Sequence, residues 1–303
     1  MSESPNRRVS PATVFFALLA LGLGIALYVK TRPAERPVTA PAATPVPRQA
    51  AARKPRPAPT SPVPARERTA APARARIAIV IDDLGNDREA LERIARWPFA
   101  VGGAVLPGLP GSADAARRLA ASGKEVLLHL PMEPDGYPLV QPGPGVILRS
   151  DDDEKIAHTL IDDLASVPGA VGVNNHMGSA ATADPRVMRA VVRVLAERGL
   201  FLLDSRTSEA TVARRVADEA ALPAVSRRVF LDAIPKAAAI ERAYRELLAT
   251  AKREGEAIAI GHPHPATLDL LERELPRLEG VRLVRVSELA RVNGSRLQVS
   301  SSR

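Results

Sequence analysis

The sequence predicts an irregular (β/α) barrel of about seven strands, on two observations. Short apolar runs alternate with longer amphipathic segments from residue 76 to residue 290, which is typical of a parallel α/β domain. The number of these strand–helix units favours a barrel over an open sheet. Neither GxGxxG nor GxxxxGK[ST] occurs, so the sequence does not support a nucleotide-binding site.

The first expected strand covers residues 77–81, which read IAIVI. Five consecutive apolar residues suit a strand that is covered on both faces, as in a parallel sheet. Two carboxylates, Asp82 and Asp83, follow directly, and then comes the turn-forming Gly85. Functional residues of α/β barrels lie at such strand ends, although either aspartate could instead cap the next helix.

The remaining elements follow from the same pattern. Further strands are expected at residues 101–106, 125–130, 170–173, 200–203, 229–231, 257–260 and 282–286. Helices are expected at residues 87–96, 112–122, 151–166, 185–198, 209–221, 236–254 and 267–277. Ser112 and Ser150 are suitable N-caps, and Gly123 is a suitable helix end.

Charge is distributed unevenly along the chain. Residues 1–76 hold 13 Lys or Arg and 3 Asp or Glu, so this quarter is more positive than the net charge of +8 for the whole chain. The rest of the chain is therefore mildly acidic, which argues against a nucleic-acid-binding domain. Cysteine is absent, which excludes disulfides, thiolate metal sites and a cysteine nucleophile.

The basic quarter divides into three parts. Residues 1–12 form a short tail, and residues 13–29 carry no charge and suit a transmembrane anchor. A cleaved signal peptide is the alternative, although the nearest small-x-small site is only near Ala40. Residues 30–75, rich in Pro, Ala and Arg, are expected to form a disordered, extended linker. The positive residues after the apolar run slightly outnumber those before it, which by itself would place the folded domain inside the cell.

Polar residues that can perform chemistry gather after the expected strands. Four of the 5 histidines lie there, and only His158 falls on an expected helix, where it suits a solvated surface. The residues at strand ends are Asp82, Asp83, His129, Glu133, Asn174, Asn175, His176, Asp204, Asp232, His262 and His264. Because the carboxyl ends of parallel strands meet on one side of the sheet, this grouping indicates a functional site.

A zinc-type centre needs three His or Asp/Glu ligands and one open position for water. Asp83, His129 and His176 can supply these ligands, and Asp82 can act as the base. A histidine from the last strand end, His262 or His264, can protonate the leaving group.

Two other kinds of hydrolytic site have less support from the sequence. A serine triad is weakly supported, because no Gly-x-Ser-x-Gly elbow occurs. A paired-carboxylate glycosidase site remains open, with Asp82, Glu133, Asp204 and Asp232 as candidates.

Five motifs together resemble the divergent polysaccharide deacetylases, which are related to the chitin and peptidoglycan deacetylases. They are IDDLG, HLPMEP, NNHMGS, LDSRT and AIGHPHPAT, in this order between residues 76 and 289. The resemblance implies an irregular (β/α) barrel that uses a metal to remove acetyl groups from N-acetylated sugars.

The resemblance also implies roles for single residues. Asp82 falls on the base and Asp83 on a metal ligand. A second motif that normally has two histidines falls on His129 and Glu133, so Glu133 is a rival ligand and His176 can replace the missing histidine. The acid falls on His262, with His264 as a further possibility. Asp204 resembles the aspartate that orients a catalytic partner.

We therefore expect a zinc-dependent carbon–nitrogen hydrolase that deacetylates an envelope polysaccharide. Its partners would be this polysaccharide and the membrane, through residues 13–29, with no nucleic acid or nucleotide. The folded domain would lie in the periplasm on an inner-membrane anchor, or be secreted if the N-terminal segment is cleaved. The alternative is a non-catalytic module that binds an envelope glycan or protein. The last residues, 291–303, are expected to form a disordered tail.

Overall fold

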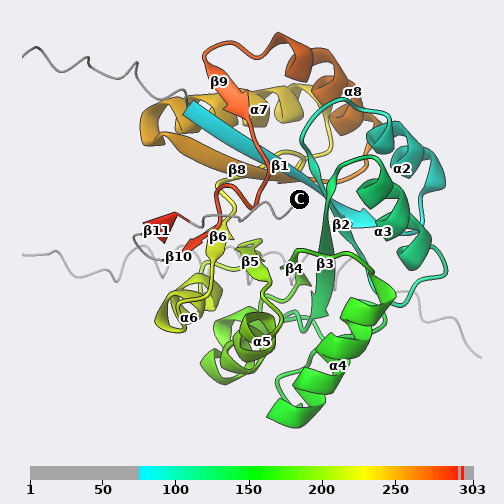
Figure 1. Ribbon diagram of the computed structural model, residues 1–303, viewed down its shortest axis with the longest axis vertical. Helices are drawn as coiled ribbons and strands as arrows, with labels where there is room; N and C mark the ends of the chain where they lie inside the picture. Colours follow the sequence, from blue (N-terminus) through cyan, green and yellow to red (C-terminus); the bar gives the residue numbers. More distant parts are fainter. Residues whose placement is uncertain (1–74, 293–294, 297–303) are drawn as a thin grey trace, which may run out of the picture. The chain divides into compact units, whose positions relative to one another are not determined.

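The computed structural model describes residues 75–292 and 295–296, which form an α/β half-barrel (Figure 1). The expected N-terminal tail, the anchor at 13–29 and the linker up to residue 74 lie outside the described residues. Within the described part, no helix combines the length and apolar character that crossing a membrane requires.

A single sheet of 11 strands forms the centre of the domain, more than the seven or so expected. The strands are β1 (Ala75–Leu84), β2 (Gly102–Val105), β3 (Glu125–Met132), β4 (Gly172–Met177), β5 (Phe201–Asp204), β6 (Ala224–Ser226), β7 (Val229–Phe230), β8 (Glu256–Gly261), β9 (Val281–Leu283), β10 (Arg291–Val292) and β11 (Ser295–Arg296). Their order is β11-β10-β6-β5-β4-β3-β2-β1-β8-β7, with β9 beside β1. All pairs are parallel except β10 with β11 and β10 with β6.

In the described part of the chain, seven α-helices lie outside the sheet (Figure 1). They are α2 (Arg88–Ala95), α3 (Ser112–Ala121), α4 (Asp153–Ser166), α5 (Pro185–Glu197), α6 (Ala213–Glu219), α7 (Ala237–Glu254) and α8 (Pro265–Glu274). Side chains of Asp87, Asp152 and Asp184 cap α2, α4 and α5 by accepting backbone N–H groups. The helices confirm the expected alternation, although α6 is shorter than the segment 209–221.

The C-terminal segment corrects one expectation. Residues from Arg291 onward were expected to be a disordered tail, but β10 pairs with β6 through Arg291 and Ala224. β11 then pairs with β10. The described residues 291–292 and 295–296 therefore belong to the sheet.

The strands alternate between two apolar layers. On β1, Ile77, Ile79 and Ile81 belong to the large cluster that packs under the helices. Ala78 and Val80 point the other way, into a smaller cluster formed by strands and the C-terminal segment. Because side chains alternate along a strand, residues two apart enter the same layer. We call this odd or even position along the strand the parity of a residue.

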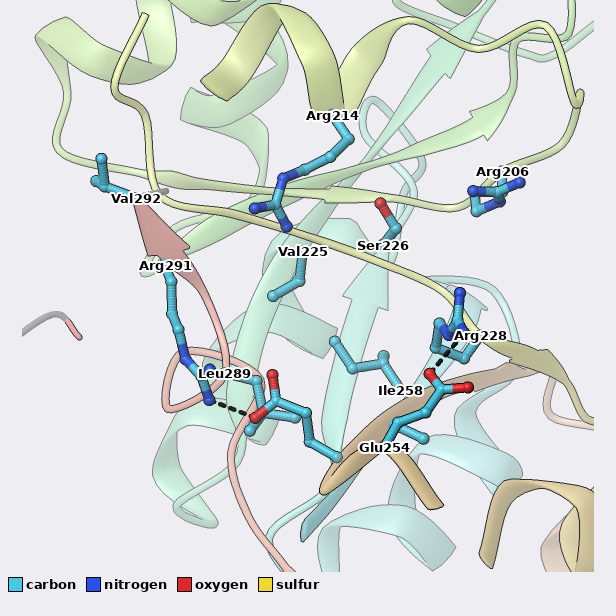
Figure 2. Close-up of a pocket in the computed structure, with 12 residues that line it drawn as sticks. Arg206, Arg214, Val225, Ser226, Arg228, Glu254, Ile258, Leu289, Arg291 and Val292 are labelled. Atoms are coloured by element: carbon cyan, nitrogen blue, oxygen red, sulfur yellow. Dashed lines mark hydrogen bonds and ion pairs between the residues drawn. The ribbon is translucent and has the colours of Figure 1, made fainter. Parts of the chain in front are cut away.

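The half-barrel has a seam between β6 and β8, by which we mean a break where these two strands do not pair. Only Arg227 and Arg228 separate β6 from β7, yet β6 pairs with β5 and β10 whereas β7 pairs with β8. A pocket of about 570 Å³ occupies this seam, and Arg206, Arg214, Arg228 and Arg291 are among its lining residues (Figure 2). We call it the seam pocket.

Candidate metal-binding and catalytic site

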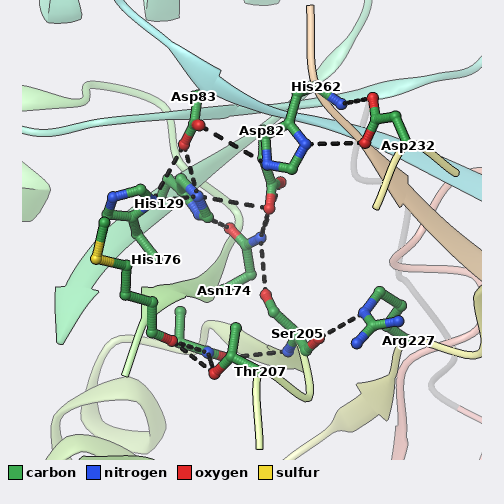
Figure 3. Close-up of polar contacts among 12 residues, drawn as sticks. Asp82, Asp83, His129, Asn174, His176, Ser205, Thr207, Arg227, Asp232 and His262 are labelled. Atoms are coloured by element: carbon green, nitrogen blue, oxygen red, sulfur yellow. Dashed lines mark hydrogen bonds and ion pairs between the residues drawn. The ribbon is translucent and has the colours of Figure 1, made fainter. Parts of the chain in front are cut away.

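Alternation along the strands brings the chemically active residues into the inner layer. Asp82 shares the parity of Ala78 and Val80, and His129 shares that of Leu127, all of which face inward. Asn174 lies directly beside His129, because β3 and β4 pair these two residues in register. The site is therefore built at the carboxyl ends of adjacent parallel strands (Figure 3).

Asp82 is buried and held by one neighbouring amide. Nδ2 of Asn174 donates to both carboxylate oxygens of Asp82, at 2.9 and 3.0 Å. Burial raises the pKa of Asp82 above its usual range, against the opposing charges of His129 and His262 and the Asn174 hydrogen bond. A carboxylate with a raised pKa and a fixed orientation is suited to accept a proton.

Asp83, His129 and His176 form a group that could hold a metal ion. Oδ1 of Asp83 lies 3.2 Å from Nε2 of His129 and 3.1 Å from Nδ1 of His176. The two ring nitrogens are 3.1 Å apart (Figure 3). Two imidazoles and one carboxylate are a common ligand set for a catalytic zinc ion.

The hydrogen bonds around His129 favour a cation at this point. Asn174 donates its amide to Asp82, so its Oδ1, 3.1 Å from Nδ1 of His129, must accept a hydrogen from that ring. In the neutral ring, Nε2 is then a lone pair facing Oδ1 of Asp83. Two acceptors at this distance repel each other unless a proton or a metal ion lies between them.

Asp83 carries two further marks of a ligand position. Its Oδ1 is buried and makes no hydrogen bond among the described residues. Its backbone is in the left-handed region, with φ of 58°, which a non-glycine residue adopts only where the surroundings hold it. Burial alone would raise the pKa of Asp83, but His129 and His176 outweigh it and hold this pKa far below its usual range. The group therefore fits a divalent cation by its chemistry and by its unsatisfied oxygen.

His262 lies next to this group and is held by Asp232. Oδ1 of Asp232 is 2.9 Å from Nδ1 of His262, and Oδ2 accepts the backbone N–H of His262 at 2.7 Å. Thr267 Oγ1 also donates to Oδ2 of Asp232, at 2.7 Å. Burial lowers the pKa of His262, but the hydrogen bond and charge of Asp232 outweigh it and raise this pKa. Nε2 of His262 is left facing Asp83, 3.7 Å from its Oδ2.

His264 lies at the edge of the site. Its ring centre is 5.9 Å from that of His262, and its side chain is exposed. With Asp232 and His262 it forms a second group whose ligand atoms could hold a metal ion. It does not join Asp83 and His129.

The structure separates Glu133, the expected rival ligand, from the metal-binding group. Both oxygens of Glu133 are occupied by Arg149: Oε2 accepts its backbone N–H at 2.6 Å and Oε1 accepts from its guanidinium at 3.0 Å. This carboxylate anchors the loop after β3. His176, on the neighbouring strand, takes the place beside His129.

Asp204, which the resemblance implies orients a catalytic partner, hydrogen-bonds to Arg206 and Thr211 and not to His262. Asp204 shares the parity of Leu202, which packs under the helices, whereas Leu203 and Ser205 point inward. Its Oδ1 accepts the N–H of Arg206 at 2.9 Å and its Oδ2 accepts from Thr211 at 3.3 Å. Burial raises the pKa of Asp204. The aspartate that orients His262 is Asp232.

The structure brings Asn174, Asp232 and Arg227 into this site. The sequence analysis assigned no role to Asn174 or Arg227, and it named Asp232 only as a candidate of a paired-carboxylate site, not as the partner of His262. The alternation of side chains along β4 and after β7 could have indicated that Asn174 and Asp232 point into the site. Asn174 follows outward-facing Val173, and Asp232 follows outward-facing Leu231. No comparable signal marks Arg227, which lies between two strands.

A cavity of about 340 Å³ opens onto these residues. Its lining residues are Asp82, His129, Asn175, His176, Met177, Ser205, Arg206, Thr207, Arg227, Phe230, Ile260 and His262. We call it the catalytic cavity, because it combines the buried carboxylate of Asp82, the imidazoles of His129, His176 and His262, and an apolar wall. Its size suits a small organic ligand.

The fold and the site define an α/β half-barrel protein with a group that could hold a metal ion, a buried carboxylate and an aspartate-held histidine at the ends of its parallel strands. Comparison with known proteins identifies the family of this protein. Residues 79–290 match the sequence model of the divergent polysaccharide deacetylases. The chain belongs to this family.

Two relatives and one solved structure are similar over most of the domain. An uncharacterized protein of Haemophilus influenzae is 35% identical over 72% of this chain and 77% of its own. The uncharacterized protein YibQ of Escherichia coli is 38% identical over 71% of this chain and 67% of its own. The crystal structure of uncharacterized protein ATU2773 from Agrobacterium tumefaciens matches with a TM-score of 0.68 at 28% identity, over 74% of this chain and 92% of that one.

Proposed function

We propose that this protein is a metal-dependent deacetylase that hydrolyses the acetamide of an N-acetylated polysaccharide. One observation carries the proposal. A buried carboxylate, Asp82, and an aspartate-held imidazole, His262, both adjoin the group formed by Asp83, His129 and His176. Hydrolysis of an amide needs a base for water, an acid for the leaving amine and a positive charge for the oxyanion.

The ligand set favours zinc as the metal. A divalent cation held by Asp83, His129 and His176 would polarise the acetyl carbonyl and lower the pKa of a water molecule. The Asn174 amide would fix the ring of His129 from behind, as a carbonyl or carboxylate does in many metal sites.

Asp82 would take the proton from the attacking water at its carboxylate. The raised pKa of Asp82 makes the group a stronger base than an exposed aspartate, and the hydrogen bonds from Asn174 keep both oxygens in place. Burial in the catalytic cavity also limits exchange of this proton with solvent.

His262 would give a proton from Nε2 to the amine that leaves the acetyl group. Asp232 accepts the hydrogen on Nδ1, which holds the ring orientation and stabilises the charged imidazolium. Phe230 packs edge-on against this ring, with centres 5.2 Å apart, and limits its rotation.

The substrate would be a polysaccharide of the cell envelope. Residues 13–29 would anchor the chain in the inner membrane, and residues 30–75 would extend the domain into the periplasm. A cleaved signal segment would instead release the same domain. The uncharged length of residues 13–29 supports the anchor, and the proline content of residues 30–75 supports the extended linker.

Acetate release by the full-length chain tests the proposal. The metal-free protein is supplied with zinc, cobalt or manganese and incubated with a hexasaccharide of N-acetylglucosamine and with envelope polysaccharides. Acetate should appear only with metal, and Asp82→Asn should slow it by about 10²–10⁴-fold. Glycan binding without acetate release under all metals would refute the enzyme and favour a binding module.

A further inference from the structure

Arg206 occupies a position that the proposed chemistry does not use. It lies in the LDSRT motif after β5 and lines both the catalytic cavity and the seam pocket. Its side chain is exposed. Figure 2 shows it at the edge of the seam pocket, apart from the ion pairs of Arg228 and Arg291.

The other arginines of the seam pocket are already paired. Arg214 contacts Asp218 at 2.9 Å, Arg228 contacts Glu254 at 2.5 Å, and Arg291 pairs with Glu256. In residues 75–292, no carboxylate lies within ion-pair distance of the Arg206 guanidinium. Its charge is therefore available to a ligand.

The backbone of Arg206 is fixed in a conformation that favours glycine. Its φ is 49°, its N–H donates to Oδ1 of Asp204 at 2.9 Å, and its carbonyl accepts from Arg227 at 2.8 Å. This is the role of the outward-facing Asp204: it shapes the turn that presents Arg206. A strained residue held by its surroundings at the mouth of a cavity points to a functional position.

Arg227 adds a second positive charge to the same cavity. Its guanidinium donates to the carbonyls of Ser205 and Arg206, at 2.5 and 2.8 Å, and packs over Phe230 at 4.9 Å. Burial lowers the pKa of Arg227, and the charge of Arg206 lowers it further, against the opposing charges of Asp204 and Asp82. Two arginines thus face one cavity whose acidic residue, Asp82, is buried. An oxyanion on the ligand would offset this repulsion.

We infer that the catalytic cavity takes an N-acylated glycan that carries an oxyanion, and that Arg206 binds this oxyanion beside Arg227. The inference rests on the proposed deacetylase function and narrows its substrate to an acidic sugar chain. The planar guanidinium of Arg206 can bind a carboxylate or a phosphate with two parallel hydrogen bonds. Phe230 offers an apolar surface to the ring of the sugar.

Binding to matched ligands tests this inference. The full-length chain carries Asp82→Asn, so that it does not hydrolyse the ligand, and is loaded with zinc. It is titrated calorimetrically with a hexasaccharide that alternates N-acetylglucosamine and glucuronate. The same hexasaccharide with methyl-esterified carboxylates is the neutral control. The affinities for N-acetylglucosamine 6-phosphate and for N-acetylglucosamine are also compared. A preference in this second pair would show that the oxyanion is a phosphate and not a carboxylate.

The acidic ligand should bind about tenfold more tightly than its ester, since a charge-assisted pair contributes of this order. Arg206→Gln should abolish the preference for the acidic ligand over its ester. Arg206→Lys should keep part of it, and Arg189→Gln, which removes an exposed arginine of α5, should keep all of it.

Equal affinity for the acidic and neutral members of both pairs would overturn the inference, as would a preference that survives Arg206→Gln. Acetate release from a neutral hexasaccharide by the wild type, without preference for the acidic one, would leave the deacetylase standing and defeat the acidic substrate. A preference that depends on Arg206 but is accompanied by no acetate release would support the oxyanion site and defeat the deacetylase.

Discussion

Asp232 binds His262 twice, through the imidazole Nδ1 at 2.9 Å and through the backbone N–H at 2.7 Å. The two contacts fix the position of the main chain and the direction of the ring together. β7 and β8 make this possible, because they pair Phe230 with Ile260 and so bring the residues after both strands side by side. His262 therefore cannot turn Nε2 away from the catalytic cavity without losing a hydrogen bond.

Replacing Asp232 by Asn should slow acetate release by about 10²–10⁴-fold with little change in KM. The amide keeps the shape but loses the charge that stabilises the imidazolium. Thr267→Val removes only the hydroxyl that donates to Asp232 and should have a much smaller effect. Steady-state kinetics of both variants checks this, and equal effects would mean that Asp232 acts only by packing.

Asn174→Ala should destabilise the protein by about 1–3 kcal/mol at neutral pH, because it leaves the buried carboxylate of Asp82 without its amide donor. The hydrogen bond lowers the pKa of Asp82, so its loss raises that pKa further. The destabilisation should therefore be greatest where Asp82 is charged and shrink as the pH falls. Urea unfolding at several pH values measures it, and a loss of stability independent of pH would argue for a packing defect instead.

Metal binding should depend on His129 and His176. The wild-type chain should bind about one zinc ion per chain, and a His129→Ala/His176→Ala double variant should lose at least about tenfold in affinity. His158→Ala removes an exposed histidine of α4 and is the matched control. Elemental analysis after dialysis against a competing chelator decides the outcome, and undiminished zinc in the double variant would refute the site.

Asp163 should make stability depend on pH away from the active site. Its side chain is buried against Gly145, and burial, helped by the charge of Asp162, raises the pKa of Asp163 to about 7. The folded state therefore binds a proton that the unfolded state releases near pH 4. Its stabilising effect is complete below about pH 4 and is lost as the pH rises through about 7.

Asp163→Asn should remove this dependence and stabilise the protein by about 2 kcal/mol at pH 8. Asp162→Asn, at the exposed neighbouring position, should leave most of the dependence in place. Thermal unfolding from pH 5 to pH 8 measures both. A wild-type stability that does not fall over this range would show that Asp163 ionises normally.

Period-two alternation could have distinguished Asp232 from Asp204. Leu231 faces outward, so Asp232 enters the inner layer, whereas Leu203 faces inward and directs Asp204 to the helices. The resemblance to the family implied an orienting role for Asp204 through the LDSRT motif. Position at a strand end was a sound criterion for the site, but the direction of the side chain was also needed.

Other features depend on contacts that no local pattern contains. Glu133 has the spacing of a ligand, yet Arg149 returns through the loop after β3 and occupies both of its oxygens. Arg206 lies in a turn that two residues hold: Asp204 accepts its N–H, and Arg227, from the next strand connection, donates to its carbonyl. Loop paths of this kind are decided by the whole domain.

The sequence by itself determined the alternating strands and helices, the gathering of acids and histidines at strand ends, and the family. These follow from periodicity and motif order, which are local properties of the chain. Only the tertiary structure decided that Asp83 turns into the left-handed region to meet His129 and His176, and that Asp232 is the partner of His262. The physical reason is that the site is formed by residues from strands that are neighbours in the sheet. The order of strands in the sheet differs from their order in the chain, so the sequence does not show which strand ends meet.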